Sequence, residues 1–189
     1  MPAMSSPTSF VDGVLVHQAD LNNLSVNIDT LTQLTQGKPA ASGVSHKPMA
    51  MVKLTSPQPV NNSTDLIVPW HAEVYDFDNL WTPGSANRFS VQTSGKYVIR
   101  MGTDWSANAT GLRTTKIFVN GTSNANTVAG YSAPPPSAFD AFYTVESPPV
   151  SLAAGASVYF DVFQSSGVTL DLGLSFGGTW ASIEWVAPF

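Results

Sequence analysis

The chain has 189 residues, of which only 11% are charged, against roughly 25% in ordinary soluble domains. Its eight Lys and Arg are scattered and its net charge is −5, which argues against a nucleic-acid-binding surface. Cysteine is absent, so disulfides, thiol nucleophiles and thiolate metal sites are excluded. The sequence has no basic-then-apolar leader and no run of about 18–20 apolar residues, so we expect neither a signal peptide nor a membrane span.

The hydrophobic pattern changes its period between residues 37 and 48. Before this point apolar residues recur every three or four positions, which is typical of one helical face. After it they alternate every second residue, which is typical of strands. The pattern predicts an N-terminal anchor at residues 1–44 and an all-β head at residues 45–189.

A short helix is expected at residues 20–36. Asp20 suits its N-cap, and Gly37 followed by Pro39 gives a stop signal. The apolar positions of this helix are Leu21, Leu24, Ile28 and Leu31. They form two heptads, and we expect them to serve oligomerisation or anchoring.

Two interpretations of this helix remain open. It packs against its own β head, or it is stabilised by other chains, as a trimeric bundle or docked into a larger assembly. A helix this short and polar is marginal in water by itself. The second interpretation is favoured because residues 37–43 read as a spacer that separates the helix from the head.

The rest of the chain predicts many short strands. Alternation places Tyr97 and Ile99 on one strand face and Arg100 and Asp104 on the other. Asn120-Gly121 signals a two-residue turn, and Gly177-Gly178 a hairpin between the last two strands. The expected strands lie at residues 49–54, 66–75, 95–105, 112–119, 139–145, 158–162, 168–176 and 180–186. This spacing, with Gly, Pro, Asn and Ser turns, indicates a β-sandwich or barrel.

No catalytic motif stands out. The three histidines (His17, His46 and His71) are far apart in sequence and are expected to be structural or exposed. A glycosidase would need two carboxyl groups within about 5–10 Å of each other. The acids that sequence leaves open for this are Asp140, Glu146, Asp161 and Asp171. For Asp161 and Asp171 the simpler interpretation is a charge that faces outward. We expect that the protein is not an enzyme.

Two ligand sites are considered. Asp76 and Asp78, near Glu73, could supply oxygen ligands to Ca²⁺, although the EF-hand spacing is absent and a solvated loop is the alternative. No other cofactor is expected. Exposed aromatic residues could stack on sugars of a host cell surface. The candidates are Trp70, Trp81 and Trp105.

Several runs of the head resemble the C1q/TNF-like jelly roll over about residues 50–189. The runs are Arg88–Val91, Ser94–Ile99, Gly111–Arg113, Ile117–Gly121, Leu152–Val158 and Gln164–Gly167. Ala156 departs from the acid that the family usually carries after its Leu-x-x-Gly turn. The resemblance implies a jelly-roll sandwich that assembles as a homotrimer through apolar and aromatic faces.

The N-terminal segment is similar to the openings of bacteriophage tail and virion-surface proteins. The similarity rests on Ser9–Gly13 and Ala19–Asn22. It implies a non-enzymatic structural protein on the virion surface, either a capsid decoration protein or a minor tail protein. Its expected partners are its own copies and other virion proteins, such as the major capsid or tail proteins. Such a protein would lie on the virion surface and reach the outside of the host by lysis rather than by secretion. The alternative is a host-adhesion head that binds cell-surface glycans.

Overall fold

The computed structural model describes residues 9–11, 14–16, 47–84, 87–135 and 139–189. The chain divides into two units, Met1–His46 and Lys47–Phe189. In the first unit, β1 (Ser9–Val11) and β2 (Val14–Val16) form an antiparallel pair in which Ser9 lies opposite Val16. The predicted helix at residues 20–36, with Leu21, Leu24, Ile28 and Leu31, lies outside the described residues and stays a prediction.

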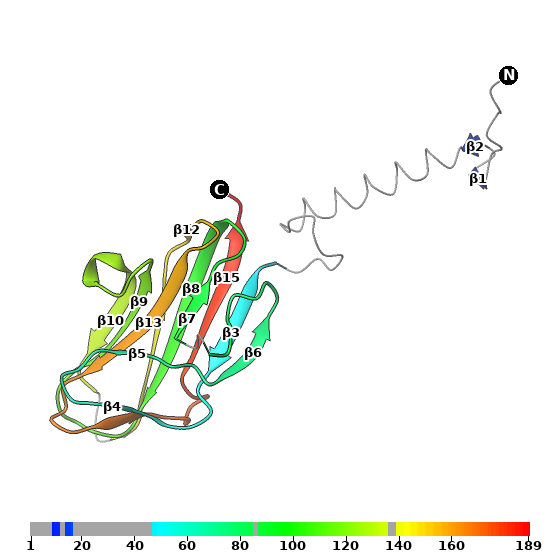
Figure 1. The fold of residues 1–189 in the computed structure, drawn as a ribbon. Coiled ribbons are helices and arrows are strands. Elements are labelled where there is room, and N and C mark those ends of the chain that lie inside the picture. The colour runs from blue at the N-terminus through cyan, green and yellow to red at the C-terminus, as the bar shows by residue number, and fades with distance from the viewer. Residues whose placement is uncertain (1–8, 12–13, 17–46, 85–86, 136–138) are drawn as a thin grey trace. The chain divides into compact units, whose positions relative to one another are not determined.

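The second unit is a sandwich of two antiparallel sheets, as the alternating pattern predicted (Figure 1). The larger sheet runs in the order β6 (Ala72–Asp76), β3 (Met49–Lys53), β15 (Trp180–Ala187) and β8 (Gly95–Trp105). Beyond β8 lie β11 (Ala141–Glu146) and β12 (Val150–Leu152), which pair with successive stretches of it. Two short strands, β14 (Leu170–Leu172) and β4 (Gln58–Val60), extend the sheet at the Trp105 end of β8.

The smaller sheet is centred on β13 (Ser157–Gln164). One edge of β13 pairs with β9 (Arg113–Val119), which in turn pairs with β10 (Thr127–Ala133). The other edge pairs with β5 (Leu66–Ile67) and β7 (Arg88–Ser90). A short 3-10 helix (Asn124–Asn126) lies between β9 and β10. Among the described residues, no helix has the length and apolar character needed to cross a membrane.

The core lies between the two sheets and is strongly aromatic. Phe160 of β13 has Trp70 at 5.6 Å and Phe89 at 5.4 Å between ring centroids, both edge to face. From the larger sheet, Tyr97 and Ile99 of β8 point into the core and are fully buried. The predicted faces of this strand are therefore confirmed, with Arg100 and Asp104 on the outer side.

Two predicted strands are shorter than expected. Residues 66–75 form two strands in different sheets, β5 and β6, rather than one. In residues 168–176 only β14 is a strand, because the chain leaves the sheet at Gly173 and Phe176 has a left-handed backbone (φ 42°). Leu174 and Phe176, expected to alternate in that strand, are exposed loop residues.

Both predicted two-residue turns are wrong. Asn120 does take a left-handed conformation, but residues 120–126 together connect β9 to β10. The strands on either side of Gly177-Gly178 do not form a hairpin, since β14 and β15 lie on either side of β8. The two glycines, both with positive φ, turn the chain across the end of β8.

Candidate functional site

The outer face of the larger sheet carries side chains that line up across several strands. Strand register places one row of residues directly across five strands. In order, the row is Tyr75, Met51, Ser182, Arg100 and Glu146. Tyr75 also stacks on Phe77, with ring centroids 5.7 Å apart and the planes at 16°. We call this surface the outer sheet face.

The next row toward the Trp105 end of β8 is centred on a glycine. Gly102 of β8 lies opposite Trp180 of β15 and Thr144 of β11. A Cβ atom on Gly102 would lie 2.6 Å from the indole Nε1 of Trp180 and 2.8 Å from the Cζ of Phe142. Both rings therefore lie over the backbone of β8, and the absence of a side chain at position 102 makes room for them.

Arg100 is the electrostatic centre of this face. Its guanidinium bonds Glu146 of β11 through Nε and Glu184 of β15 through Nη1, the latter at 3.2 Å. The hydrogen bond that Arg100 donates to Glu146 is the largest cause that raises the pKa of Arg100. The two carboxylates and the one guanidinium together carry a net negative charge, and the side chains around them on the outer sheet face are largely apolar.

A shallow hollow of about 390 Å³ opens beside Arg100. It is lined by Arg100, Thr144, Val145, Glu146 and Trp180. An indole beside charged hydrogen-bonding groups is a combination that suits a sugar or a partner's side chain. The described lining has no histidine, serine or cysteine that could act as a nucleophile with a base.

The three predicted stacking aromatics are not on this face or on any other surface. Trp70, Trp81 and Trp105 are 2%, 6% and 0% exposed. The expectation that they are exposed is wrong, because each fills the core: Trp70 contacts Phe160, and Trp105 lies under the Arg113 guanidinium at 5.8 Å. Trp180 and Phe142, which sequence analysis did not single out, occupy the outer face instead.

In the loop considered for calcium binding, the carboxylate of Asp76 has a structural role. Asp76 accepts backbone N–H bonds from Asp78 (3.2 Å), Leu80 (2.9 Å) and Trp81 (2.8 Å). Its oxygens thus fix the turn after β6, an arrangement that needs no ion. Among the described residues, no group of three or more His, Cys, Asp and Glu side chains could hold a metal.

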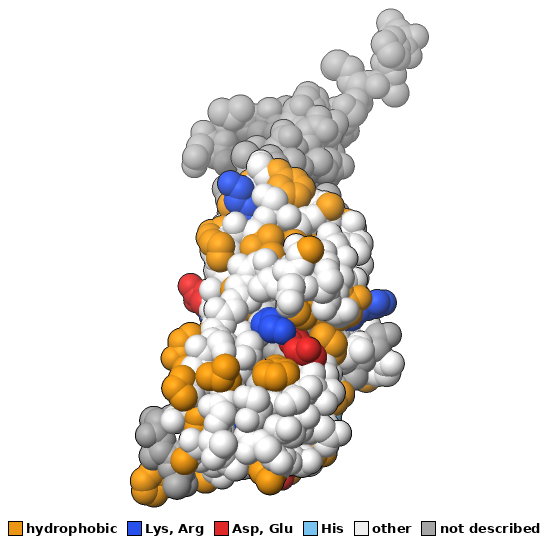
Figure 2. Space-filling model, turned by 90° about the vertical axis from the view of Figure 1, so that its left-hand side faces the viewer, with side chains coloured by type: hydrophobic (Ala, Val, Ile, Leu, Met, Phe, Trp, Pro, Cys, Tyr) orange, Lys and Arg blue, Asp and Glu red, His pale blue; other side chains and the backbone are white. Residues whose placement is uncertain are grey.

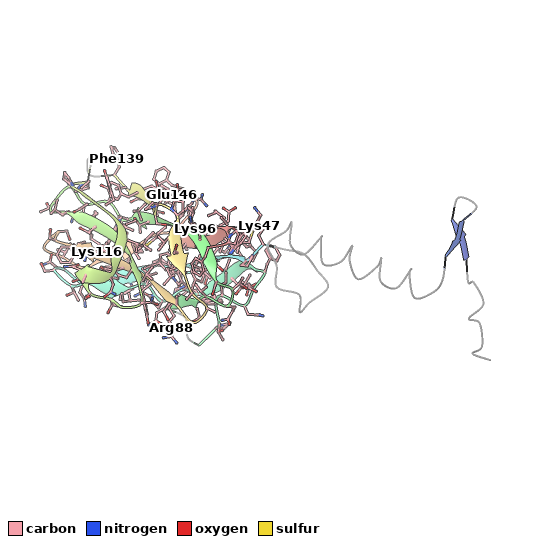
Figure 3. The ribbon with its side chains drawn as sticks, turned by 90° about the horizontal axis from the view of Figure 1, so that it is seen from above. Lys47, Arg88, Lys96, Lys116, Phe139 and Glu146 are labelled. Atoms are coloured by element: carbon pink, nitrogen blue, oxygen red, sulfur yellow. The ribbon has the colours of Figure 1, made fainter. Side chains whose placement is uncertain are left out.

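Two of the four acids considered for glycoside hydrolysis, Glu146 and Asp161, lie on different sheets. Glu146 pairs with Arg100 on the outer sheet face, whereas Asp161 lies on β13 and pairs with Lys116 at 3.2 Å. Figure 3 shows the labelled Glu146 and Lys116 at different places on the head. Asp171 is exposed on β14, and Asp140 binds the Ala107 backbone N–H at 2.9 Å. The outward-facing charge expected for Asp161 is wrong, because the residue is only 1% exposed and lies beside Lys116.

Charge is sparse elsewhere on the head as well. Figure 2, which shows the side on which β10 lies, has a few blue and red side chains among scattered hydrophobic ones. The polar surface is mostly uncharged, as the composition of the chain predicts.

Comparison with known proteins relates the chain to others through its fold. No protein-family model matches it, and no curated protein matches its sequence. Two solved structures superpose on most of the head. Eiger TNF from S. frugiperda has 13% identity and a TM-score of 0.51, covering 76% of this chain and 94% of that one. Murine APRIL has 14% identity and a TM-score of 0.54, covering 74% and 98%.

The head is a C1q/TNF-like jelly roll. This is the fold that the sequence resemblance implied. Identities of 13% and 14% establish the fold alone, so the role of this head has to be argued from its surface.

Proposed function

We propose that this chain is a non-enzymatic structural protein of a bacteriophage virion, assembled as a homotrimer. Its jelly-roll head is displayed on the particle surface, and its N-terminal segment attaches it to a capsid or tail protein. The observation that carries the self-association is the outer sheet face. The phage assignment is supported by the resemblance of Ser9–Gly13 and Ala19–Asn22 to virion-protein openings.

The outer sheet face suits a second copy of the same chain. Its Met, Tyr, Trp and Phe side chains offer an apolar area, while the Arg100 cluster supplies a polar centre that fixes orientation. Most soluble oligomers are closed symmetric assemblies of copies of one chain, and this is the arrangement that we infer for the outer sheet face. Covering this face would shield Met51, Tyr75 and Trp180 from water.

The attachment role of residues 1–44 is tested on particles. A phage that encodes the chain is grown with the full-length protein or with a variant lacking residues 1–44, and purified particles are analysed by quantitative mass spectrometry. We expect the truncated chain to fold and to be absent from particles. Normal incorporation of the truncated chain refutes the anchor. Cross-linking on wild-type particles then identifies a capsid or a tail neighbour.

A second function, binding of host-surface glycans, is favoured by the hollow beside Trp180 and Arg100. In this proposal the sugar stacks on the half-buried indole of Trp180 on the outer sheet face, and not on the three buried tryptophans. A trimer that covers this face also covers the hollow, so the two proposals compete for the same surface. A glycan array with the wild-type chain and Trp180→Ala tests it: binding that the variant loses supports an adhesin, and a blank array supports a scaffold.

A further inference from the structure

Asp104 is a buried carboxylate without a hydrogen-bond partner. It is the second-last residue of β8, on the outer side of the larger sheet, and is 1% exposed. Neither Oδ1 nor Oδ2 has a partner in the described structure. Burying an ionised carboxylate without compensation is costly, so such groups are paired, protonated or bound to a cation.

The chain is wrapped tightly around this carboxylate. The backbone of Asp104 accepts a bond from the Gly173 N–H at 2.6 Å and donates one to Thr179 Oγ1 at 3.1 Å. A Cβ atom on Gly173 would come within 3.2 Å of Asp104 Oδ2. The loop at residues 173–179 therefore packs closely against Asp104, and a side chain at position 173 would press on its carboxylate.

A second carboxylate, that of Asp140, forms a hydrogen bond with the same β14–β15 loop. Asp140, just before β11, accepts a bond from the Ala107 N–H at 2.9 Å and one from Ser175 Oγ at 3.2 Å. Burial raises the pKa of Asp104 first, and the negative charge of Asp140 raises it further. The Ser175 backbone N–H lowers that pKa without making a full hydrogen bond. No Lys or Arg of the described residues forms an ion pair with either acid.

We propose that Asp104 and Asp140 bind a divalent cation of the Ca²⁺ class, with Ser175 Oγ as a neutral ligand. Ca²⁺ accepts irregular sets of carboxylate, hydroxyl, carbonyl and water oxygens. The carboxylate oxygens of Asp104, which have no hydrogen-bond partner, are the buried ligands of this site. Asp140 and Ser175 are exposed, so an ion can enter from solvent and keep bound water on that side.

The cation would tie three segments together at one end of the head. These segments are the end of β8, the residues just before β11 and the β14–β15 loop. Strand register puts the site at the end of β8 away from the C-terminus, since Ala187 lies opposite Lys96 at the other end. The neighbouring Phe139, labelled in Figure 3, and Phe176 are 77% and 70% exposed. The bound ion would thus set the shape of a loop surface that carries exposed aromatics.

The site should be weak, because it has only two carboxylates. Affinities of about 10⁻⁴–10⁻³ M are usual for extracellular modules of this kind. The full chain, stripped with a chelator, is titrated with calcium chloride up to about 10 mM, tenfold above the weak end of that range. Binding is followed by calorimetry and by the melting temperature. We expect saturable binding with a rise in melting temperature.

Substitutions of single Asp residues test where the ion binds. Asp104→Asn and Asp140→Asn should each weaken binding at least tenfold, whereas Asp171→Asn, on an exposed strand residue, should leave it unchanged. Asp104→Asn removes a buried unpaired charge, so without calcium it should melt no lower than the wild type, which separates lost binding from lost folding. Failure of the folded wild type to bind, or unchanged binding by Asp104→Asn, overturns the site. Equal binding of magnesium chloride overturns its Ca²⁺ preference.

Discussion

Trp180 lies across Gly102 on the outer sheet face, with its Nε1 atom 2.6 Å from the point where a Cβ on Gly102 would be. Phe142 comes within 2.8 Å of the same point from the opposite neighbour strand. One missing side chain on β8 thus lets strands β11 and β15 each lay an aromatic ring over the sheet. This relationship explains how two aromatic rings can lie over the backbone of β8 at Gly102.

Gly102→Ala should displace both rings. The methyl group cannot fit under them, and overpacking of this kind typically costs about 1–3 kcal/mol. We expect a lower free energy of unfolding by urea denaturation and a changed tryptophan fluorescence spectrum. Gly130→Ala is the matched control, because an added Cβ there has no neighbour closer than 3.5 Å. Equal losses of unfolding free energy in the two variants would show that the packing of the two rings does not depend on Gly102.

Asp76→Ala should loosen the turn after β6. The change leaves the backbone N–H groups of Leu80 and Trp81 without their acceptor, and each unsatisfied buried donor costs about 1–3 kcal/mol. We expect a loss of at least about 1 kcal/mol in the free energy of unfolding. Asp171→Ala, on an exposed side chain, should change it by less than about 0.5 kcal/mol. Similar values for both variants contradict the structural role of Asp76.

Stability should decrease between about pH 4 and pH 7 through Asp161. Burial raises its pKa from 3.8 to about 7, against the opposing effect of Lys116. Between these two pH values the Asp161 carboxyl binds a proton more strongly in the folded state than in the unfolded state. The stability that this difference contributes is therefore lost as the pH rises. The slope is on the order of 1 kcal/mol per pH unit.

Asp161→Asn should remove this contribution. Urea denaturation of the wild type and the variant at several pH values gives the comparison, and the gap between them should widen in the variant's favour toward pH 7. Asp104, whose pKa is also raised, is unchanged in both proteins and cancels in the difference. A gap that stays constant with pH means that Asp161 is ionised throughout.

Sequence patterns predicted the class of the fold because alternation is a local signal. In β8 each second residue from Tyr97 points into the core, and this could be read directly. The pattern could not show which strands pair, since pairing depends on contacts between distant residues. Residues 66–75 therefore read as one strand although β5 and β6 belong to different sheets.

The surface was harder to predict than the core. Sequence alone cannot tell whether a tryptophan in a short segment points inward, and Trp70, Trp81 and Trp105 all do. The sign that could have pointed to Trp180 is its place as the first residue of the last alternating strand, in phase with Glu184 rather than with Ile183. The approach of Asp104 and Asp140 depends on the end of β8, the residues before β11 and the β14–β15 loop coming together, and the sequence carries no signal for this.

Sedimentation equilibrium of the full-length chain and of Met51→Arg tests most directly whether the outer sheet face joins copies of this protein. We predict that the wild type has three times its 20.0 kDa chain mass and that Met51→Arg, at a half-buried residue of the outer sheet face, is a folded monomer. Val168→Arg, at a loop side chain that is 52% exposed, should remain a trimer. A wild type with a single chain mass, or a Met51→Arg variant that still forms trimers, would contradict the proposed interface.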